Sequence, residues 1–312
     1  MKKTNSEQNN YNNHKKYRGR FAPSPSGELH FGSLLAAMAS YADAHSHNGQ
    51  WLLRIDDIDK PRIVVDSDQH IIQTLEQCGF QWDGPITYQS QYLNQYQQAL
   101  EQLTELGFTY PCTCSRKQIK ALSVNGIYPG TCRKHMALSS SDQSHAFSEY
   151  AIRVTVPEDE IKFIDLIQQS YGMRLNQEVG DFVIFRRDKV FSYQLSVVVD
   201  DFQSQISHVI RGYDLIDSTP RQIFLQLLLG YPIPEYGHIP LAVTDDNLKL
   251  SKLTHARKVS CDIKTLVLAA RFLGQKVMNP NDYDHKEDFW QHLLQIWDLK
   301  AVPKMEKREI MY

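Results

Sequence analysis

Apolar residues recur at helix and strand spacing along the chain and predict alternating strands and helices in its first third. The segment Trp51–Ile55 is a short apolar run typical of a buried strand. Helical spacing predicts a helix that begins after His30 and ends near Gly49, and further helices over about 66–78 and about 90–106. Because strands that alternate with helices are typical of a parallel sheet, we expect an α/β fold here.

The alternation breaks after Cys112. A cysteine-containing loop, a polar run rich in Ser and His, and a short strand near 150–156 predict an inserted module that ends at about Gly180. The α/β pattern then resumes, with strands predicted over 182–185, 190–199 and 208–211.

The last part of the chain is predicted to be mostly helical. Thr219, followed by Pro220 at the first helical position, predicts a capping-box start for a helix that ends at Gly230. Two more helices are predicted over 263–272 and 286–296. They form a short helical segment that ends in charged residues.

Composition favours an ordinary globular chain, since 42% of residues are hydrophobic and 22% are charged. No apolar run approaches the roughly 20 residues of a membrane span. The first 16 residues are polar and lack an apolar stretch, so we expect a disordered extension and no secretory signal.

A net charge of −2 means that any nucleic-acid contact must use a local basic patch. Each candidate taken alone is more often a solvated face. The candidates are Arg133–Lys134, Arg186–Arg187 with Lys189, and Arg257–Lys258.

Five cysteines, an odd number, without a signal peptide favour a reducing compartment, and hence the cytoplasm. Cys78 and Cys261 are predicted to stand alone. Cys78 ends an apolar helical pattern and is expected to be buried and inert.

The other three cysteines form a compact cluster in sequence. Cys112 and Cys114 lie one residue apart, so on an extended chain both thiols point the same way, and Cys132 adds a third. Three cysteines this close favour a structural metal site over coincidental core residues. For the fourth ligand, His135 is an ordinary zinc ligand, whereas neutral Tyr128 is a poor one until the metal displaces its proton. Chemistry alone leaves the choice open.

Two segments have the composition of phosphate-binding loops. A strand end and a Pro/Gly-rich turn lead into the predicted helix start, where Gly32, Ser33 and the neighbouring His30 surround free backbone N–H groups. The second segment is a polar loop in which Lys249 and Lys252 flank Ser251 and offer positive charge to a polyphosphate. Each segment alone is weak evidence, and together they are strong.

The two segments resemble known signatures. His30-Phe31-Gly32-Ser33 and Lys249-Leu250-Ser251-Lys252 are similar to the HIGH and KMSKS motifs of class I aminoacyl-tRNA synthetases. The form Arg-Phe-Ala-Pro-Ser-Pro-Ser-Gly, which begins at Arg20, resembles the glutamyl and glutaminyl branch. The Cys-x-Cys…Tyr-x3-Cys pattern resembles the zinc site of the glutamyl-Q tRNA(Asp) synthetase family, which implies Tyr128 and not His135 as the fourth zinc ligand.

The resemblance implies a Rossmann-type parallel-sheet catalytic domain split by a zinc-containing insertion and followed by a short helical segment. The expected divisions are the extension over 1–16, the first half of the catalytic domain over 17–111, the tRNA-contacting insertion over 112–180, the second half with the KMSKS-like loop over 181–260, and the helical segment over 261–312.

The resemblance also implies roles for individual residues. Glutamate would be bound by Arg20, Phe21, Ala22, Pro23, Ser24, Asp56, Tyr193 and Arg211. ATP, accompanied by Mg²⁺, would be bound by His30, Gly32, Ser33, Lys249, Ser251 and Lys252, with His30 and Lys252 acting in catalysis. Asp56 stands where the family usually has Glu, and it keeps the charge that would pair with the substrate ammonium. A salt bridge to Arg54 is the alternative for that carboxylate.

The residues after Lys252 are too few for the helical anticodon-binding region of glutamyl-tRNA synthetases, which favours the glutamyl-Q tRNA(Asp) family. Membership implies that the protein activates L-glutamate without tRNA and attaches it to the queuosine base of tRNA(Asp). We expect it to be a cytoplasmic monomer. One alternative is a truncated glutamyl-tRNA synthetase that charges a tRNA 3′ end. Another is a non-catalytic zinc-containing RNA-binding protein, against which His30 and Lys252 argue.

Overall fold

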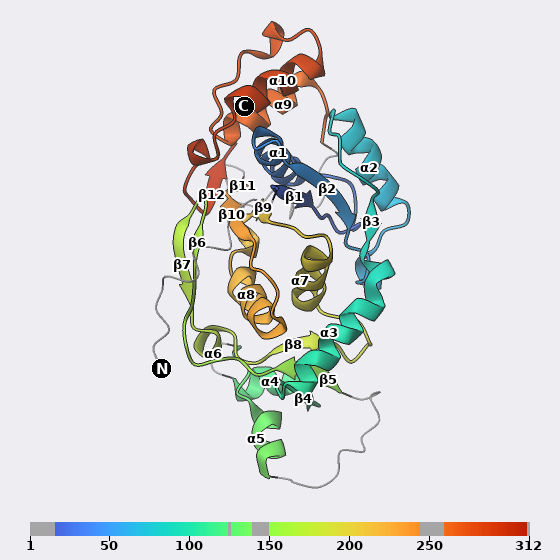
Figure 1. Cartoon of the computed structure of the whole chain (residues 1–312), viewed down its shortest axis with the longest axis vertical. Helices are drawn as coiled ribbons and strands as arrows, with labels where there is room; N and C mark the ends of the chain where they lie inside the picture. Colours follow the sequence, from blue (N-terminus) through green and yellow to red (C-terminus); the bar gives the residue numbers. More distant parts are fainter. Residues whose placement is uncertain (1–15, 124–125, 139–149, 244–258, 311–312) are drawn as a thin grey trace.

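The structure is a computed structural model, and it describes residues 16–123, 126–138, 150–243 and 259–310 (Figure 1). Nearly all of the predicted N-terminal extension lies outside these residues. The KMSKS-like loop with Lys249, Ser251 and Lys252 lies outside them too.

The centre of the molecule is a parallel sheet made of two groups of strands. The first group runs in the order β1 (Arg18–Phe21), β2 (Gln50–Ile55) and β3 (Thr87–Tyr88), and the second pairs β9 (His208–Gly212) with β10 (Glu235–Ile239). The two groups are neighbours because the backbone N–H of Ser207, just before β9, donates to the carbonyl of Arg18 at 2.9 Å. The predicted parallel α/β sheet is confirmed.

The predicted helices of the first part are also confirmed. They are α1 (Phe31–Ser46), α2 (Ser67–Gln77) and α3 (Leu93–Glu105). Almost all of α1 after its first turn is buried, because the sheet lies on one side and the C-terminal helices lie on the other. Figure 1 shows α9 (Ile263–Phe272) and α10 (Lys286–Ile296) above α1, with the ranges that the apolar spacing predicts.

One predicted strand is wrong. The second half of the run 190–199 begins the helix α7 (Tyr193–Gln203), in which Ser192 caps the N-terminus by accepting from the backbone N–H of Leu195. Leu195 to Asp201 are all buried, because α7 packs against α3, α8 (Ser218–Leu229) and β8 (Phe182–Phe185). A helix buried on every side has no polar stripe, so its apolar, β-branched sequence resembles a buried strand.

The capping box predicted at Thr219 is also wrong, although α8 ends at Gly230 as expected, with Gly230 in the left-handed conformation. Asp217 is the N-cap residue, and Thr219 lies inside the first turn. The Thr219 hydroxyl accepts a hydrogen bond from Nη2 of Arg211 at 2.7 Å. The Thr219 hydroxyl therefore takes part in a tertiary hydrogen bond with Arg211 and does not cap its own helix.

An antiparallel sheet in the order β4 (Thr109–Cys112), β5 (Ala151–Val154), β8 joins the range predicted as an insertion to the segments on either side of it. Of these three strands, only β5 lies wholly within 112–180. Figure 1 shows α4 (Arg116–Leu122) and α5 (Thr131–Leu138) beside this sheet at the lower end of the molecule. The hairpin of β6 (Ile161–Asp165) and β7 (Gln169–Met173) reaches back to the central sheet, where Asp165 pairs with Tyr236 of β10. The remaining elements are α6 (Leu175–Glu178) and the parallel pair β11 (Leu241–Val243) and β12 (Lys307–Glu309).

Two large apolar cores stabilise the fold. One lies between α1, the first strands and the C-terminal helices, and contains the buried rings of Tyr41, Trp51, Phe80 and Trp290. The other surrounds α3, α7 and α8. Because the C-terminal helices share the first core, they belong to the same folded body as the central sheet.

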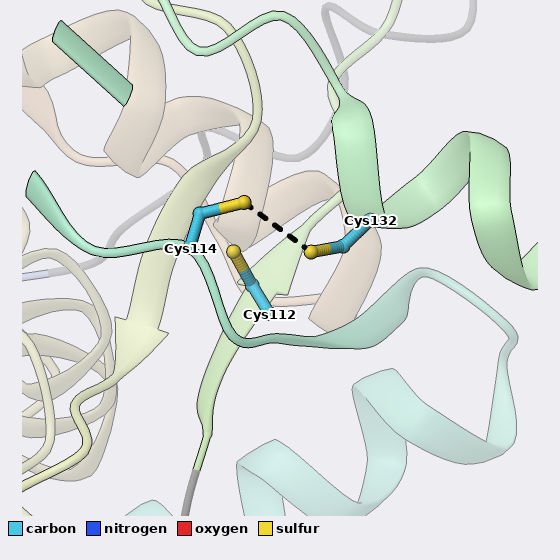
Figure 2. A group of neighbouring side chains, drawn as sticks. All are labelled: Cys112, Cys114 and Cys132. Carbon is cyan, nitrogen blue, oxygen red and sulfur yellow. Dashed lines mark hydrogen bonds between the residues drawn. The ribbon is translucent and has the colours of Figure 1, made fainter. Parts of the chain in front are cut away.

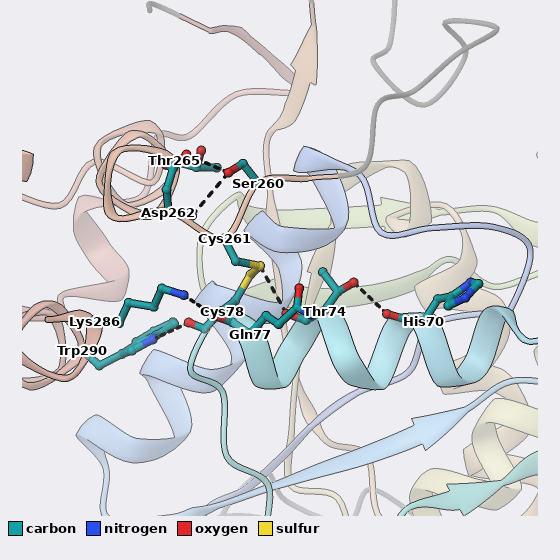
Figure 3. Close-up of a disulfide and its surroundings, with 10 residues drawn as sticks. All are labelled: His70, Thr74, Gln77, Cys78, Ser260, Cys261, Asp262, Thr265, Lys286 and Trp290. Atoms are coloured by element: carbon teal, nitrogen blue, oxygen red, sulfur yellow. Dashed lines mark hydrogen bonds between the residues drawn. A yellow bond between two sulfur atoms is a disulfide. The ribbon is translucent and has the colours of Figure 1, made fainter.

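Cys78 and Cys261 do not stand alone, contrary to the sequence expectation. They form a disulfide between the end of α2 and the segment before α9 (Figure 3). Cys78 is buried, as predicted, and its carbonyl accepts a hydrogen bond from the indole N–H of Trp290 at 2.9 Å. The two cysteines are 183 residues apart in sequence, so no local pattern could reveal the pair.

Candidate functional site

Several of the residues expected to bind glutamate gather at the carboxyl ends of the central strands, where ligands bind in open α/β sheets. The segment Phe21–Ser24 leaves β1, and Asp56 immediately follows β2. The two loops are joined because the backbone N–H of Asp56 donates to the carbonyl of Pro23 at 2.9 Å. Phe21 is buried, Ala22 and Pro23 are half-buried, and Ser24 is exposed.

Arg20 and Asp56 belong to one buried network of charges. Asp201 of α7 accepts from Nε and Nη2 of Arg20, both at 3.3 Å, and from Nη1 of Arg54 at 2.7 Å. Asp56 accepts from Nε of Arg54 at 2.7 Å. The alternative partner considered for Asp56 is therefore the one found in the structure.

The network holds more carboxylates than guanidinium groups, since Asp200 also lies within it. Asp200 accepts hydrogen bonds from Tyr96 at 2.5 Å and from Gln89 at 2.7 Å. Burial raises the pKa of Asp200 to about 6 although Arg54 opposes the rise. Burial would also raise the pKa of Asp201, but Arg20 and Arg54 lower it. Sequence reasoning assigned no role to Asp200 and Asp201. The one signal in the sequence is that these two acidic residues follow directly after an apolar run.

The other expected glutamate ligands, Tyr193 and Arg211, also contact each other. Arg211 of β9 is 4% exposed, and its Nη1 donates to the hydroxyl of Tyr193 at 3.4 Å. Its guanidinium lies 5.3 Å from the ring centre of Tyr236. Burial raises the pKa of Tyr236 to about 12, although the charges of Arg211 and Arg20 oppose the rise. The two arginines therefore act on the same buried ring from neighbouring strands.

The turn expected to bind phosphate forms the N-terminus of α1. His30 is the N-cap residue, and its Nδ1 accepts from the backbone N–H of Ser33 at 3.2 Å. The hydroxyl of Ser33 lies 3.3 Å from Nε2 of the same ring. A helix of 16 residues directs its positive end to this turn. Lys249, Ser251 and Lys252 lie outside the described residues.

The structure brings Cys112, Cys114 and Cys132 together (Figure 2). Their sulfur atoms all lie within 4.8 Å of one another, and the Cys114 and Cys132 sulfurs are 3.5 Å apart. The hydroxyl of Tyr128 faces the cluster, 3.5 Å from the sulfur of Cys112 and 3.9 Å from that of Cys114. The side chain of His135 lies outside what the structure describes.

The electrostatics of the cluster suit a cation. Burial raises the pKa of Cys114 to about 11. Burial acts in the same direction on Cys132, but hydrogen bonds from Tyr128 and from the backbone of Thr113 lower its pKa to about 7. One thiol is therefore close to ionisation at neutral pH, and a bound metal would displace protons from the others. Three thiols and one phenol in this arrangement fit a tetrahedral zinc site.

A cavity of about 350 Å³ lies beside the cysteine cluster. Tyr128, Gly130, Arg133 and Asp181 contribute to its walls. Arg133 of the first predicted basic patch pairs with Asp181 at 3.3 Å, and Arg186 of the second pairs with acidic residues as well. These patches are partly neutralised within the protein, while Arg257–Lys258 lies outside the described residues.

Comparison with known proteins extends these observations. The sequence model of the family "tRNA synthetases class I (E and Q), catalytic domain" matches residues 16–266. The chain is 48% identical over 263 residues to "Glutamyl-Q tRNA(Asp) synthetase" of Pseudomonas syringae pv. tomato. The match covers 84% of this chain and 86% of that protein. The chain belongs to the glutamyl-Q tRNA(Asp) synthetase family.

A second member of the glutamyl-Q tRNA(Asp) synthetase family, from Dechloromonas aromatica, is 45% identical over 92% of this chain and 96% of its own length. The crystal structure of glutamate-tRNA synthetase from Elizabethkingia anophelis has a TM-score of 0.73 and 21% identity, and the match covers 94% of this chain and 68% of that one. That likeness shows the class I synthetase fold.

Membership in the glutamyl-Q tRNA(Asp) synthetase family makes the protein an ATP-dependent ligase of the aminoacyl-tRNA synthetase type. Within the described residues, no helix is long and apolar enough to cross a membrane. The residues that sequence analysis missed are all buried partners of the expected ligands. They are Asp200 and Asp201 in the charge network, and Asp165 and His238 behind Arg211.

Proposed function

We propose that the protein activates L-glutamate with ATP in the absence of tRNA and transfers the glutamyl group to the queuosine base in the anticodon of tRNA(Asp). The similarity to curated glutamyl-Q tRNA(Asp) synthetases over most of the chain carries this proposal. The gathering of Arg20, Asp56, Tyr193 and Arg211 at one end of the parallel sheet supports it. We place the reaction in the cytoplasm, with the enzyme as a monomer.

In the proposed first step, the α-carboxylate of glutamate attacks the α-phosphate of ATP and displaces diphosphate, giving glutamyl-adenylate. Arg20 and Arg211 supply guanidinium groups for the two carboxylates of glutamate, since the N–H donors of Arg form strong charge-assisted hydrogen bonds with carboxylate. Phe21, Ala22, Pro23 and Ser24 shape the same pocket, and Asp56 receives the substrate ammonium.

The ATP, which binds with Mg²⁺, is held by His30, Gly32 and Ser33 at the N-terminus of α1, where backbone N–H groups favour phosphate. Lys249, Ser251 and Lys252 contribute from the KMSKS-like loop, and Lys252 stabilises charge that develops on the phosphates in the transition state. No protein side chain needs to be covalently modified in this step.

The cysteine cluster is proposed to hold one structural zinc ion through Cys112, Cys114, Tyr128 and Cys132. The position of the Tyr128 hydroxyl among the three sulfurs supports this ligand set. The ion would fix the chain between β4 and α5, because a closed four-ligand site crosslinks the segments that supply it. We propose that the region from 112 to 180 contacts the tRNA.

The proposal is tested in two assays. Glutamate-dependent exchange of diphosphate into ATP should proceed without tRNA. Labelled glutamate should then be transferred to tRNA(Asp) that carries queuosine and not to the same tRNA from cells that cannot make queuosine. Nuclease mapping should locate the label in the anticodon loop. Label on the 3′-terminal adenosine would favour a truncated glutamyl-tRNA synthetase, and the lack of any adenylate would favour a non-catalytic RNA-binding protein.

A further inference from the structure

The side chain of Arg211 contacts a buried histidine, His238, which in turn contacts a buried aspartate, Asp165. The parallel register of β9 and β10 places His238 directly opposite Arg211, and Nε of Arg211 donates to Nε2 of His238 at 3.0 Å. On the far side of the ring, Nδ1 of His238 lies 2.5 Å from a carboxylate oxygen of Asp165 on β6. His238 is 0% exposed and Asp165 is 1% exposed, so water cannot replace either contact.

The chemistry of Arg211 decides where the proton of His238 lies. A guanidinium has only N–H donors and stays charged, so the ring nitrogen that faces it must be an acceptor. Nε2 is therefore unprotonated, and Nδ1 carries the hydrogen that it donates to Asp165. Burial and the charge of Arg211 together lower the pKa of His238 to about 4, although Asp165 opposes the shift, so the ring is neutral at physiological pH.

Asp165 is itself fixed by the backbone. Its Oδ1 accepts from the N–H groups of Ile167 at 2.9 Å, Gln168 at 2.8 Å and His238 at 3.2 Å. Burial would raise the pKa of Asp165, but the hydrogen bond from His238 and these backbone donors lower it. A rigid carboxylate thus fixes the orientation and tautomer of the ring, and the ring fixes Arg211.

We propose that Asp165 and His238 are positioning residues that hold Arg211 in the orientation in which it binds a carboxylate of the substrate, an inference that rests on the proposed function. Nε is used by His238, and Nη2 is used by Thr219 and the carbonyl of Leu215. Nη1 donates one hydrogen to the hydroxyl of the exposed Tyr193, and its second hydrogen is available to meet an oxygen of glutamate. A guanidinium held in this way loses little conformational entropy when the substrate binds.

Asp165→Asn is the decisive variant. The new amide has nearly the same shape, but its NH2 group would donate to Nδ1 of His238 and force the hydrogen onto Nε2, where it would face the N–H of Arg211. We expect the KM for glutamate to rise roughly tenfold or more, with kcat and the KM for ATP changed by less than about threefold. An unchanged KM for glutamate in a folded variant would overturn the proposal.

Tyr17→Phe is the matched control. It removes a buried hydrogen bond of 2.5 Å, from Tyr17 to Asp43, that makes no contact with Arg211. If Asp165 and His238 only stabilised the fold, both variants would lower the melting temperature and neither would change the KM for glutamate. A wild-type protein with no glutamate-dependent exchange would instead contradict the proposed function, independently of this inference.

A measurement on the wild-type protein keeps the proposal testable if Asp165→Asn does not fold. Nitrogen-15 NMR of histidine side chains should show one ring protonated at Nδ1 and unprotonated at Nε2, with that state unchanged between about pH 8 and pH 5. The resonance is assigned by its loss in His238→Gln. A ring protonated at Nε2 would exclude acceptance from Arg211 and would refute the positioning role.

Discussion

The hydroxyl of Tyr128 lies 3.5 Å from the sulfur of Cys112 and accepts the backbone N–H of Cys132 at 2.9 Å. Tyr128 is 5% exposed, and the guanidinium of Arg153 covers its ring at 3.8 Å. Its oxygen is therefore held among the thiols, a place that a simple packing role for the ring would not require.

Zinc content should depend on these residues. Cys112→Ser should lower bound zinc to well below one ion per chain, because a hydroxyl is a poor substitute for a thiolate. Tyr128→Phe should weaken zinc retention against a chelator, whereas His135→Ala should not. Metal analysis of the purified variants by mass spectrometry provides the measurement. Full zinc content in Cys112→Ser would remove the cluster as the metal site.

Lys252→Ala should reduce glutamate-dependent diphosphate exchange by on the order of 100-fold or more, because a cation that acts on developing phosphate charge contributes mainly in the transition state. Lys264→Ala is the control, since Lys264 is an exposed lysine on α9. Near wild-type exchange in Lys252→Ala would exclude this lysine from the chemistry.

The disulfide should contribute measurably to stability. Closing a loop between residues 183 apart is worth up to about 5 kcal/mol in the chain-entropy model, with about 2–4 kcal/mol typical. Cys261→Ser should therefore lower the free energy of unfolding by that typical amount under non-reducing conditions. In excess dithiothreitol the variant and the wild type should differ little.

Alkylation of the unfolded, unreduced chain provides an independent check of the same bond. Mass spectrometry should show three modified cysteines, Cys112, Cys114 and Cys132, when metal has been removed. Modification of all five cysteines in protein isolated without reductant would show that the pair is reduced in the cell, as the sequence-based expectation of a reducing compartment implies.

The contribution of His238 to stability should depend on pH. Its folded-state pKa of about 4 lies below its ordinary value of 6.5, so the unfolded chain binds more protons between these values. The contribution is complete above about pH 6.5 and is lost as pH falls towards 4. The charged groups that face it are Asp165, Arg211 and Arg20.

The measurement compares wild type with His238→Gln, because Asp200 has a raised pKa of about 6 and its opposite effect on stability cancels between the two proteins. The difference in unfolding free energy should shrink by on the order of 3 kcal/mol between pH 7 and pH 4. Denaturant titration at several pH values measures it. A difference that is constant with pH would mean that His238 is not held neutral.

Local sequence determined a large part of this protein. The helix that begins after His30, the terminal helices over 263–272 and 286–296, and the left-handed cap at Gly230 all follow from spacing and capping, because they depend on residues within a few positions. The cysteine cluster could be predicted for the same reason, since its three thiols come from one short stretch of chain.

Tertiary structure alone decided the rest, because it depends on contacts between distant residues. Val197 to Val199 form a helix and not a strand because α3, α8 and β8 surround them. Cys78 meets Cys261 only because α2 ends beside the segment before α9. Arg211 could be expected from the family resemblance, but the contacting Asp165–His238 pair comes from two other strands. No local pattern links a carboxylate to a histidine 73 residues away.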